Sequence, residues 1–262
     1  MGQKSLSTIF VSHGAPTMPL EDIPAKDFLM KLGKSYRNIK AVLCISAHWQ
    51  TIKPTLNAVD VNETTHDFYG FQPELYDIKY PVKGSPELAE HALDLIKDGG
   101  MECELDHTRG LDHGAWIPLM LMFPDAEIPV IQLSIQNNLD PLKHFNLGKL
   151  IEPLRHENIL ILGSGGAVHP LGYAPLHPDA KTDQWAIDFN EWLKNAVISG
   201  NTNALMNYRN SSPYPERAHP YPDHFMPLLA SIGAAGEGVN GKIIHDSWYW
   251  GDLGMGAYEF TI

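Results

Sequence analysis

The sequence predicts an α/β fold, a mostly parallel central sheet with helices on both faces in a single domain. Three observations support this prediction. Short apolar runs alternate along the chain with longer amphipathic segments, as expected for a sheet and its covering helices. The apolar runs are continuous, which is typical of parallel strands that are buried on both faces. The 262 residues are 44% hydrophobic and 19% charged, which is ordinary for one globular domain with a sizeable core.

Five apolar runs rich in Val, Ile and Leu are the predicted strands. In chain order they are TIFVS at 8–12, IKAVLCISA at 39–47, TLNAVD at 55–60, IPVIQLSI at 128–135 and NILILGSG at 158–165. The predicted helices are Pro86–Lys97, Leu142–Arg155, Thr182–Val197 and His224–Ile232. Apolar residues at helical spacing give the first of these helices a broad hydrophobic face.

Two segments rich in aromatic residues and proline are predicted to be long functional loops. They span residues 62–86 and 207–225, and neither has the low complexity of a flexible linker. No internal repeat and no break in composition divides the chain. We therefore expect one domain over residues 1–262.

Charge and cysteine content exclude several classes of protein. The net charge is −12 and there is no block rich in Lys and Arg, so the surface field repels nucleic acid and anionic membranes. The two cysteines, Cys44 and Cys103, form no disulfide framework or thiolate metal site. The first residues lack the apolar core of a signal peptide, and no run approaches the roughly 20 apolar residues of a membrane span. We expect a cytoplasmic protein that binds neither nucleic acid nor membrane.

Histidines follow three of the predicted strands at or just beyond their carboxyl ends. His13 follows TIFVS, His48 follows AVLCISA, and His169 comes after a Gly-rich turn that ends NILILGSG. The carboxyl ends of parallel strands lie along one edge of a sheet, where ligands bind. Each histidine taken alone is explained better as a packed or capping residue than as a ligand. Their shared position predicts that the three imidazoles meet at one site.

Other site motifs fit the Gly-rich turn at 162–167 less well. The turn lacks the lysine of a P-loop and the full G-x-G-x-x-G spacing. It is not the G-x-S-x-G elbow of an esterase, because Ser164 directly follows Gly163. The glycines are explained by a sharp backbone turn that leaves His169 facing an open cavity.

Seven motifs in a fixed order resemble those of the class III extradiol ring-cleavage dioxygenase family, in its DOPA 4,5-dioxygenase-like branch. They are VSHGAP, ISAHW, HDFYGFQPELYDIKYP, GLDHGAW, PVIQLSI, GSGGAVHPL and PYPDHFMPLLASIGAA. The resemblance runs from about residue 8 to at least residue 235. It implies an α/β fold, a single catalytic domain, and a non-haem Fe(II) enzyme that opens catechol rings with O₂. Some bacterial members of this branch hold zinc instead.

The resemblance also implies roles for five histidines. His13 in SHGAP and His48 in SAHW match two metal ligands, and His224 in PYPDHF matches a further ligand. His169 in GGAVHPL matches the catalytic histidine, which can also contact the metal in zinc-bound members. His113 in GLDHGAW matches a second pocket histidine that faces oxygen or substrate.

The identity of the metal is left open by this set of residues. The protocatechuate branch completes its metal site with a glutamate, whereas this chain offers His224. Two histidines and one carboxylate are typical of Fe(II), while three imidazoles with an open position suit zinc equally well. His219 is a second candidate ligand in the same loop, ranked lower because it precedes Pro220 in an extended turn.

The chemistry of catechol opening gives these residues a use. A catechol binds a divalent metal through two adjacent oxygens, and three neutral imidazoles leave positions open for them. We expect His169 to be the base that accepts a phenolic proton, and His113 to be an acid near the bound oxygen. His66 and Asp67 are expected to fix their loop or to orient a histidine.

Aromatic residues of the same loop are candidates for a flat slot around the substrate ring. They are Phe68, Tyr69, Phe71 and Tyr76. For each of them taken alone, packing of the loop onto the domain is the better explanation. Trp49 and Trp116 are expected to be core residues, while Arg109 and Lys79 are candidates for reading a charged tail of the substrate.

The sequence is consistent with three functions. The first is an Fe(II) dioxygenase that acts on a small DOPA-like catechol and O₂. The second is a zinc hydrolase that uses a zinc-bound water at the same histidines. The third is a binding protein without activity, which the presence of all five histidines disfavours. The sequence leaves open whether the chain forms a homo-oligomer.

Overall fold

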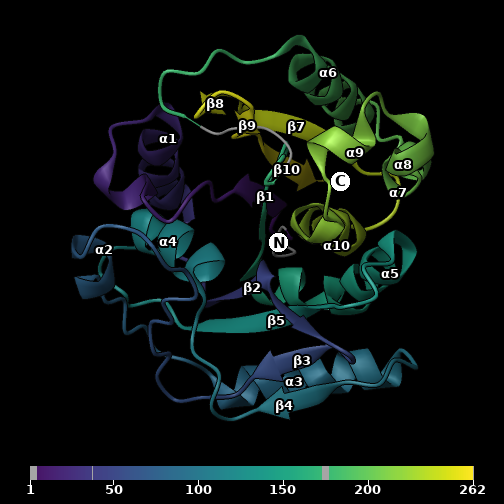
Figure 1. Cartoon of the computed structure of the whole chain (residues 1–262). Helices are drawn as coiled ribbons and strands as arrows, with labels where there is room; N and C mark the ends of the chain where they lie inside the picture. The colour runs from purple at the N-terminus through teal and green to yellow at the C-terminus, as the bar shows by residue number, and fades with distance from the viewer. Residues whose placement is uncertain (1–4, 37, 173–176, 262) are drawn as a thin grey trace.

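The central sheet of the computed structural model has eight strands in the order β4-β3-β5-β2-β6-β1-β10-β7 (Figure 1). The structure describes residues 5–36, 38–172 and 177–261. The strands of this sheet are β1 (Thr8–Ser12), β2 (Ala41–Thr51), β3 (Thr55–Asn57), β4 (Glu104–Asp106), β5 (Val130–Gln136), β6 (Ile159–Gly165), β7 (Asn240–His245) and β10 (Ala257–Thr261). A separate pair is formed by β8 (Trp248–Tyr249) and β9 (Leu253–Gly254).

Most neighbouring strands of the sheet are parallel, as predicted. The pairs β1–β6, β2–β6, β2–β5 and β3–β4 are parallel, while β3–β5, β1–β10 and β10–β7 are antiparallel. All five predicted strands are confirmed. The strands β4, β7 and β10 were not predicted, because they are short or contain several polar residues and lie at or near the edges of the sheet.

Helices cover both faces of the sheet, which confirms the predicted fold class. The longer ones are α1 (Pro24–Gly33), α3 (Pro86–Asp98), α4 (His113–Met122), α5 (Pro141–Ile151), α6 (Gln184–Ile198) and α10 (Met226–Ala235). Short ones are α2 (Glu74–Asp77), α7 (Thr202–Met206), α8 (Tyr208–Ser211) and α9 (Pro215–Ala218). In Figure 1, α1 and α4 lie on one side of β1 and β2, and α5 and α10 lie on the other.

Alternate strand residues supply two hydrophobic cores, one under each layer of helices. Phe10 and Leu43 belong to the core shared with α3, α5, α6 and α10. Ile9 and Val42, their chain neighbours, belong to the core shared with α1 and α4. This two-sided burial explains why the strands are continuously apolar. No helix in the described ranges is both long and apolar enough to cross a membrane.

Three predicted segments differ in detail from the structure. The helix predicted over 142–155 ends at Ile151 and continues as a 3₁₀ helix over Glu152–Glu157, where Pro153 lacks the N–H that an α-helix needs. The helix predicted to begin at His224 begins at Met226, after the 3₁₀ helix η4 (Pro222–Phe225). The predicted loop over 207–225 contains the short helices α8 and α9 as well as η4.

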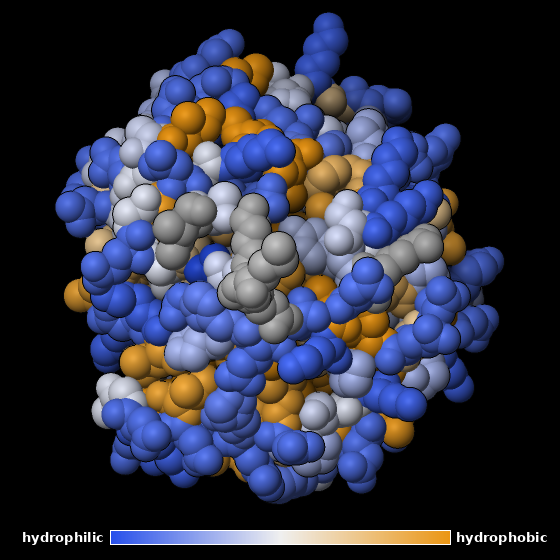
Figure 2. Space-filling view, turned by 180° about the vertical axis from the view of Figure 1, so that it is seen from behind, coloured by the Kyte–Doolittle hydropathy of each residue, from blue (hydrophilic) through white to orange (hydrophobic). Residues whose placement is uncertain are grey.

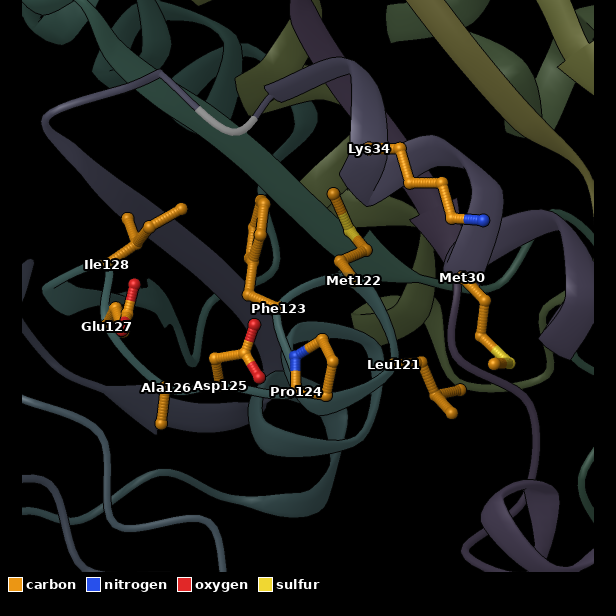
Figure 3. A pocket seen from close by; sticks show the side chains of 10 residues that line it. All are labelled: Met30, Lys34, Leu121, Met122, Phe123, Pro124, Asp125, Ala126, Glu127 and Ile128. Atoms are coloured by element: carbon orange, nitrogen blue, oxygen red, sulfur yellow. The ribbon is translucent and has the colours of Figure 1, made fainter.

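The outer surface carries no concentrated hydrophobic face in the view from behind. Figure 2 shows hydrophilic residues over most of this side, with separate hydrophobic areas between them. A hollow of about 410 Å³ lies between Met30 of α1, Lys34 just after this helix, and residues 121–128 at the end of α4 and in the loop after it (Figure 3). None of the five candidate histidines lines this hollow.

Candidate active site

His13 stands directly after β1, at the edge of the sheet where the sequence places it. Its backbone N–H donates to the carbonyl of Gly165 at the end of the neighbouring strand β6, over 3.0 Å. The side chain is buried. The parallel register of β1 and β6 thus fixes both the position of His13 and the start of the Gly-rich turn.

His48 lies inside β2, not beyond its end as the sequence suggested. The pairing of β2 with β5 is regular up to Ser46 opposite Ser134 and resumes with Gln50 opposite Ile135. Residues 47–49 therefore form an irregular bulge. Bulges of this kind re-aim side chains and are common beside active sites. The bulge explains how one strand keeps Ala47 and Trp49 in the core while His48 is partly exposed.

His113 occupies the first position of α4, whose amino end is held against β2 by a buried carboxylate. Asp112 accepts hydrogen bonds from the backbone of Ala115 over 3.2 Å and from the Ser46 hydroxyl over 2.6 Å. Gly114 permits the close approach, because a Cβ there would lie 2.5 Å from Ser46 Oγ and 2.8 Å from His48 Cδ2. Only glycine lets this helix start beside the histidines.

His224 and His169 complete the cluster from the opposite side. His224 is a buried residue of the 3₁₀ helix η4. His169 follows the Gly-rich turn, and its backbone N–H donates to the carbonyl of Ala218 over 2.8 Å. The two imidazole rings are stacked, with centroids 3.5 Å apart and an interplanar angle of 7°.

The structure brings all five candidate histidines together. His13 lies near the centre, with its ring centroid 4.9 Å from that of His48, 5.5 Å from His113 and 5.1 Å from His224. The His48 centroid is 4.0 Å from that of His113 and 4.8 Å from that of His224. The Nε2 atoms of His13 and His48 face one another over 3.0 Å.

In His13 and His224 a partner of Nδ1 fixes which ring nitrogen holds the proton. His13 Nδ1 lies 3.0 Å from Ser164 Oγ. Ser164 donates its own proton to the carbonyl of Gly114, so its oxygen must accept from His13. His224 Nδ1 lies 2.8 Å from a carboxylate oxygen of Asp223. Nδ1 therefore holds the proton in both rings, and Nε2 keeps the lone pair that a metal binds.

Ser164 also replaces a hydrogen bond that is missing inside α4. Pro118 lies inside this helix, and a proline has no N–H to donate to the carbonyl four residues before it. That carbonyl belongs to Gly114, and the Ser164 hydroxyl donates to it instead. One hydroxyl thus satisfies the helix and orients His13.

Burial keeps four imidazoles of the cluster neutral, those of His13, His48, His169 and His224. Burial and the neighbouring imidazoles hold the pKa values of His13, His169 and His224 well below their ordinary range. Burial and then the charge of His113 lower the pKa of His48 to about 4, although nearby carboxylates oppose the shift. Neutral imidazole is the form that binds metals.

The donor atoms present fit a divalent transition metal. Ring nitrogens of His13, His48 and His113 lie within 4.8 Å of one another, and donor atoms of His169, Asp223 and His224 form a second such group. His224 Nε2 is buried and has no hydrogen-bond partner among the described residues. An unpaired buried nitrogen is costly unless something binds it. Imidazole nitrogens suit iron and zinc alike.

Comparison with known proteins agrees with this geometry. Residues 7–261 match the family model described as the catalytic LigB subunit of aromatic ring-opening dioxygenase. The chain belongs to this family. It is 45% identical over 258 residues to 4,5-DOPA dioxygenase extradiol from Beta vulgaris, which covers 97% of this chain and 96% of that protein.

Further relatives of this ring-opening dioxygenase family are similar over most of their length. The 4,5-DOPA dioxygenase extradiol of Mirabilis jalapa is 42% identical, over 97% of this chain and 96% of its own. The protein of the same name from Escherichia coli K12 is 36% identical, over 89% of this chain and 87% of its own. The crystal structure of an uncharacterized protein from E. coli K12 superimposes with a TM-score of 0.80 at 29% identity, over 97% of this chain and 99% of that one.

His219, the lower-ranked candidate ligand of the sequence analysis, is packed among core residues. It is fully buried, and its Nε2 lies 3.1 Å from the carbonyl of Ala167. Its ring packs against Phe189 and Phe225, at centroid distances of 5.5 and 5.1 Å. Burial lowers its pKa to about 3. These contacts describe a neutral core histidine better than a ligand.

The aromatic loop contributes one ring directly beside the histidines. Phe68 meets the ring of His113 edge-on, with centroids 5.6 Å apart. Phe71 and Tyr76 pack against Phe68 at 5.5 and 5.2 Å. Tyr69 differs from the expectation, because it is 91% exposed and points away from any slot.

The two tryptophans and the two basic residues proposed from the sequence differ in their exposure and contacts. Trp49 and Trp116 are buried core residues, as expected. Arg109 donates to Asp112 over 3.2 Å and lies 5.3 Å over the ring of Trp49. Lys79 is exposed.

Sequence reasoning missed three residues that shape the site. Ser164, Asp112 and Asp223 each contact or position a histidine through the bonds described above. Asp112 and Asp223 directly precede His113 and His224 in the sequence, which is the signal that could have found them. Ser164 gives no such signal, because its partner His13 is 151 residues away.

Proposed function

We propose that this chain is a metal-dependent extradiol dioxygenase that inserts both atoms of O₂ into a small DOPA-like catechol and opens its ring. The family match and relatives named 4,5-DOPA dioxygenase extradiol support the reaction class and the substrate class. The observation on which the proposal depends most is the facing pair of Nε2 atoms, 3.0 Å apart, in a cluster of five histidines. The family match over residues 7–261 supports one catalytic domain across the chain.

His13, His48 and His224 are proposed to hold the metal, with His169 as a candidate fourth ligand. In His13, His48 and His224 the Nδ1 atom faces an oxygen acceptor. The lone pair of Nε2 is therefore free to bind the metal. Fe(II) is the proposed metal, since it supplies the redox chemistry that O₂ requires, and zinc is the alternative. Protein groups other than these ligands must then bind the ring and move its protons.

His169 is proposed to accept the first phenolic proton. It is partly exposed, whereas His13 and His224 are buried, so a substrate can reach it. Burial and nearby imidazoles hold its pKa well below the ordinary range, so it is neutral at pH 7 and has a ring nitrogen with a free lone pair. Stacking on His224 holds its ring in place.

His113 and Phe68 are proposed to face the substrate from the other side. Asp67 accepts a 2.9 Å hydrogen bond from the Nδ1–H of His113, which leaves Nε2 available to a polar group of the substrate or of O₂. The edge-on ring of Phe68 supplies a flat apolar wall beside it. The two residues together would orient a catechol ring.

Oxygen uptake by the iron-loaded protein tests this function. Metal-free protein is loaded anaerobically with Fe(II) and mixed with DOPA, protocatechuate or simple catechol, while O₂ and visible absorbance are recorded. We expect a yellow ring-opened product that is lost in His48→Ala and retained in His156→Ala, a control at an exposed histidine. No uptake with any catechol at stoichiometric iron would refute the dioxygenase and favour a zinc hydrolase.

The cytoplasmic location and a homo-oligomer stay predictions.

A further inference from the structure

One carboxylate of the aromatic loop reaches two of the clustered histidines. Asp67 Oδ1 accepts from the backbone N–H of His113 over 2.9 Å and also lies 2.9 Å from its Nδ1. The other oxygen, Oδ2, lies 3.7 Å from Nδ1 of His48. Asp67 is 46 residues before His113 in the chain, so the contact depends on how the loop folds.

The loop is anchored firmly enough to hold this carboxylate in place. Trp116 of α4 donates its indole N–H to the carbonyl of Thr65 over 3.1 Å, and the Thr65 N–H donates to the carbonyl of Leu111 over 2.8 Å. On the far side, His66 Nε2 lies 3.0 Å from the carbonyl of Ile78. The Asp67 side chain is only 21% exposed.

Capping of α4 does not account for the contact with the imidazole. Asp112 already caps this helix through the backbone of Ala115. The backbone bond from His113 to Asp67 adds to that cap, but the bond from Nδ1 fixes only the side chain. A carboxylate can only accept, so it selects the tautomer in which Nδ1 holds the proton.

We propose that Asp67 is a positioning residue, which holds His113 in the Nδ1–H tautomer with Nε2 free for the reaction. It also favours the same tautomer of His48, over the longer 3.7 Å contact. The effect on catalysis rests on the proposed function, whereas the effect on the tautomer does not. Loss of such outer partners of site histidines typically costs about 10–100-fold in activity or metal affinity.

The first test is the tautomer of His113, measured by ¹⁵N NMR on metal-free protein at pH 8. Asp67→Ala should convert His113 from the Nδ1–H form to a mixture containing the Nε2–H form. Asp77→Asn is the matched control, since Asp77 is exposed in the same stretch and its side chain has no bond within the described ranges. The signals are assigned with His113→Gln. A His113 tautomer that is unchanged in Asp67→Ala overturns the proposal.

The second test is turnover of the Fe(II)-loaded enzyme with a catechol. We expect kcat to fall about 10–100-fold in Asp67→Ala with KM changed less than three-fold, and both to be unchanged in Asp77→Asn. Wild-type kcat in Asp67→Ala would overturn the proposal. No turnover by wild-type enzyme, together with the tautomer change, would refute the proposed function and leave the role of Asp67 supported.

A second variant decides the matter if Asp67→Ala does not fold. Asp67→Asn keeps an oxygen for His113 but weakens the bond, because hydrogen bonds to a charged acceptor are about twice as strong. It also brings an NH₂ group toward Nδ1 of His48. We expect kcat to fall at least five-fold in this variant, and full activity would overturn the proposal.

Discussion

Replacement of Ser164 by alanine should damage both the stability of the fold and the affinity of the metal site. The hydroxyl is fully buried, accepts from His13 Nδ1 at 3.0 Å and donates to the carbonyl of Gly114. Its removal leaves two buried polar groups unpaired, each at about 1–3 kcal/mol. We expect the unfolding free energy to fall by roughly 2–6 kcal/mol, which lowers the unfolding midpoint by roughly 4–24 °C in a chain of this size.

A double variant separates the two effects of Ser164. Pro118→Ala restores an N–H for the Gly114 carbonyl, so Ser164→Ala combined with Pro118→Ala should regain part of the lost stability. It should not regain metal affinity, because His13 Nδ1 still lacks its acceptor and its Nε2 is no longer kept free of a proton. The expected loss of affinity is about 10–100-fold.

The assays are thermal unfolding and titration of metal-free protein with Zn(II) against a competing chelator. Ser231→Ala is the control, since the acceptors of this buried hydroxyl among the described residues are the carbonyls of Ile9 and Pro227. It should lose stability without losing metal affinity. The reasoning is refuted if Ser164→Ala binds Zn(II) as tightly as Ser231→Ala does.

Three further predictions follow from the cluster and its surroundings. Because burial depresses the pKa of His48 to about 4, the unfolded chain binds more protons than the folded one between about pH 6.5 and 4. The unfolding free energy of metal-free protein should therefore fall as pH drops through that window, and His48→Gln should show a shallower fall in denaturant titrations. His224→Ala should abolish stoichiometric Fe(II) binding measured by elemental analysis, whereas His219→Phe should retain it, since His219 lies among apolar rings; equal metal content in both would contradict the assignment. Phe68→Ala should raise KM for catechols about ten-fold, at 1.4 kcal/mol per factor of ten, while Tyr69→Ala, at a 91% exposed position, should leave it unchanged; the reverse order would show that the slot is elsewhere.

The central sheet could be predicted because its strands are buried on both faces. That burial demands continuous apolar runs, such as those of β2 and β6, which are visible in the sequence. The helix α4 was missed for a related reason. Its sequence HGAWIPLMLM is apolar on all sides and contains a proline, so it shows no periodic face. The edge strand β7 gave no signal, because its half-exposed and exposed positions admit polar residues. The strand β10 gave none because it is short and its sequence AYEFT contains polar residues.

The convergence of the site could be predicted, but not the bonds that tune it. The carboxyl ends of parallel strands lie along one edge of a sheet. The sequence alone therefore predicted that His13, His48 and His169 lie close together. The place of His48 on a bulge depends on the register between β2 and β5, which no local pattern encodes. The same holds for Ser164, whose two partners lie 151 and 50 residues away in the chain.

Incorporation of ¹⁸O₂ into the product is the most direct test of the central claim, that this histidine cluster serves ring opening by O₂. Fe(II)-loaded protein is supplied with the best catechol under ¹⁸O₂, and the product is examined by mass spectrometry. We expect two ¹⁸O atoms in each ring-opened product molecule, and no product from His13→Ala. A product that takes its oxygen from water, or one formed equally well by His13→Ala, would contradict the central claim.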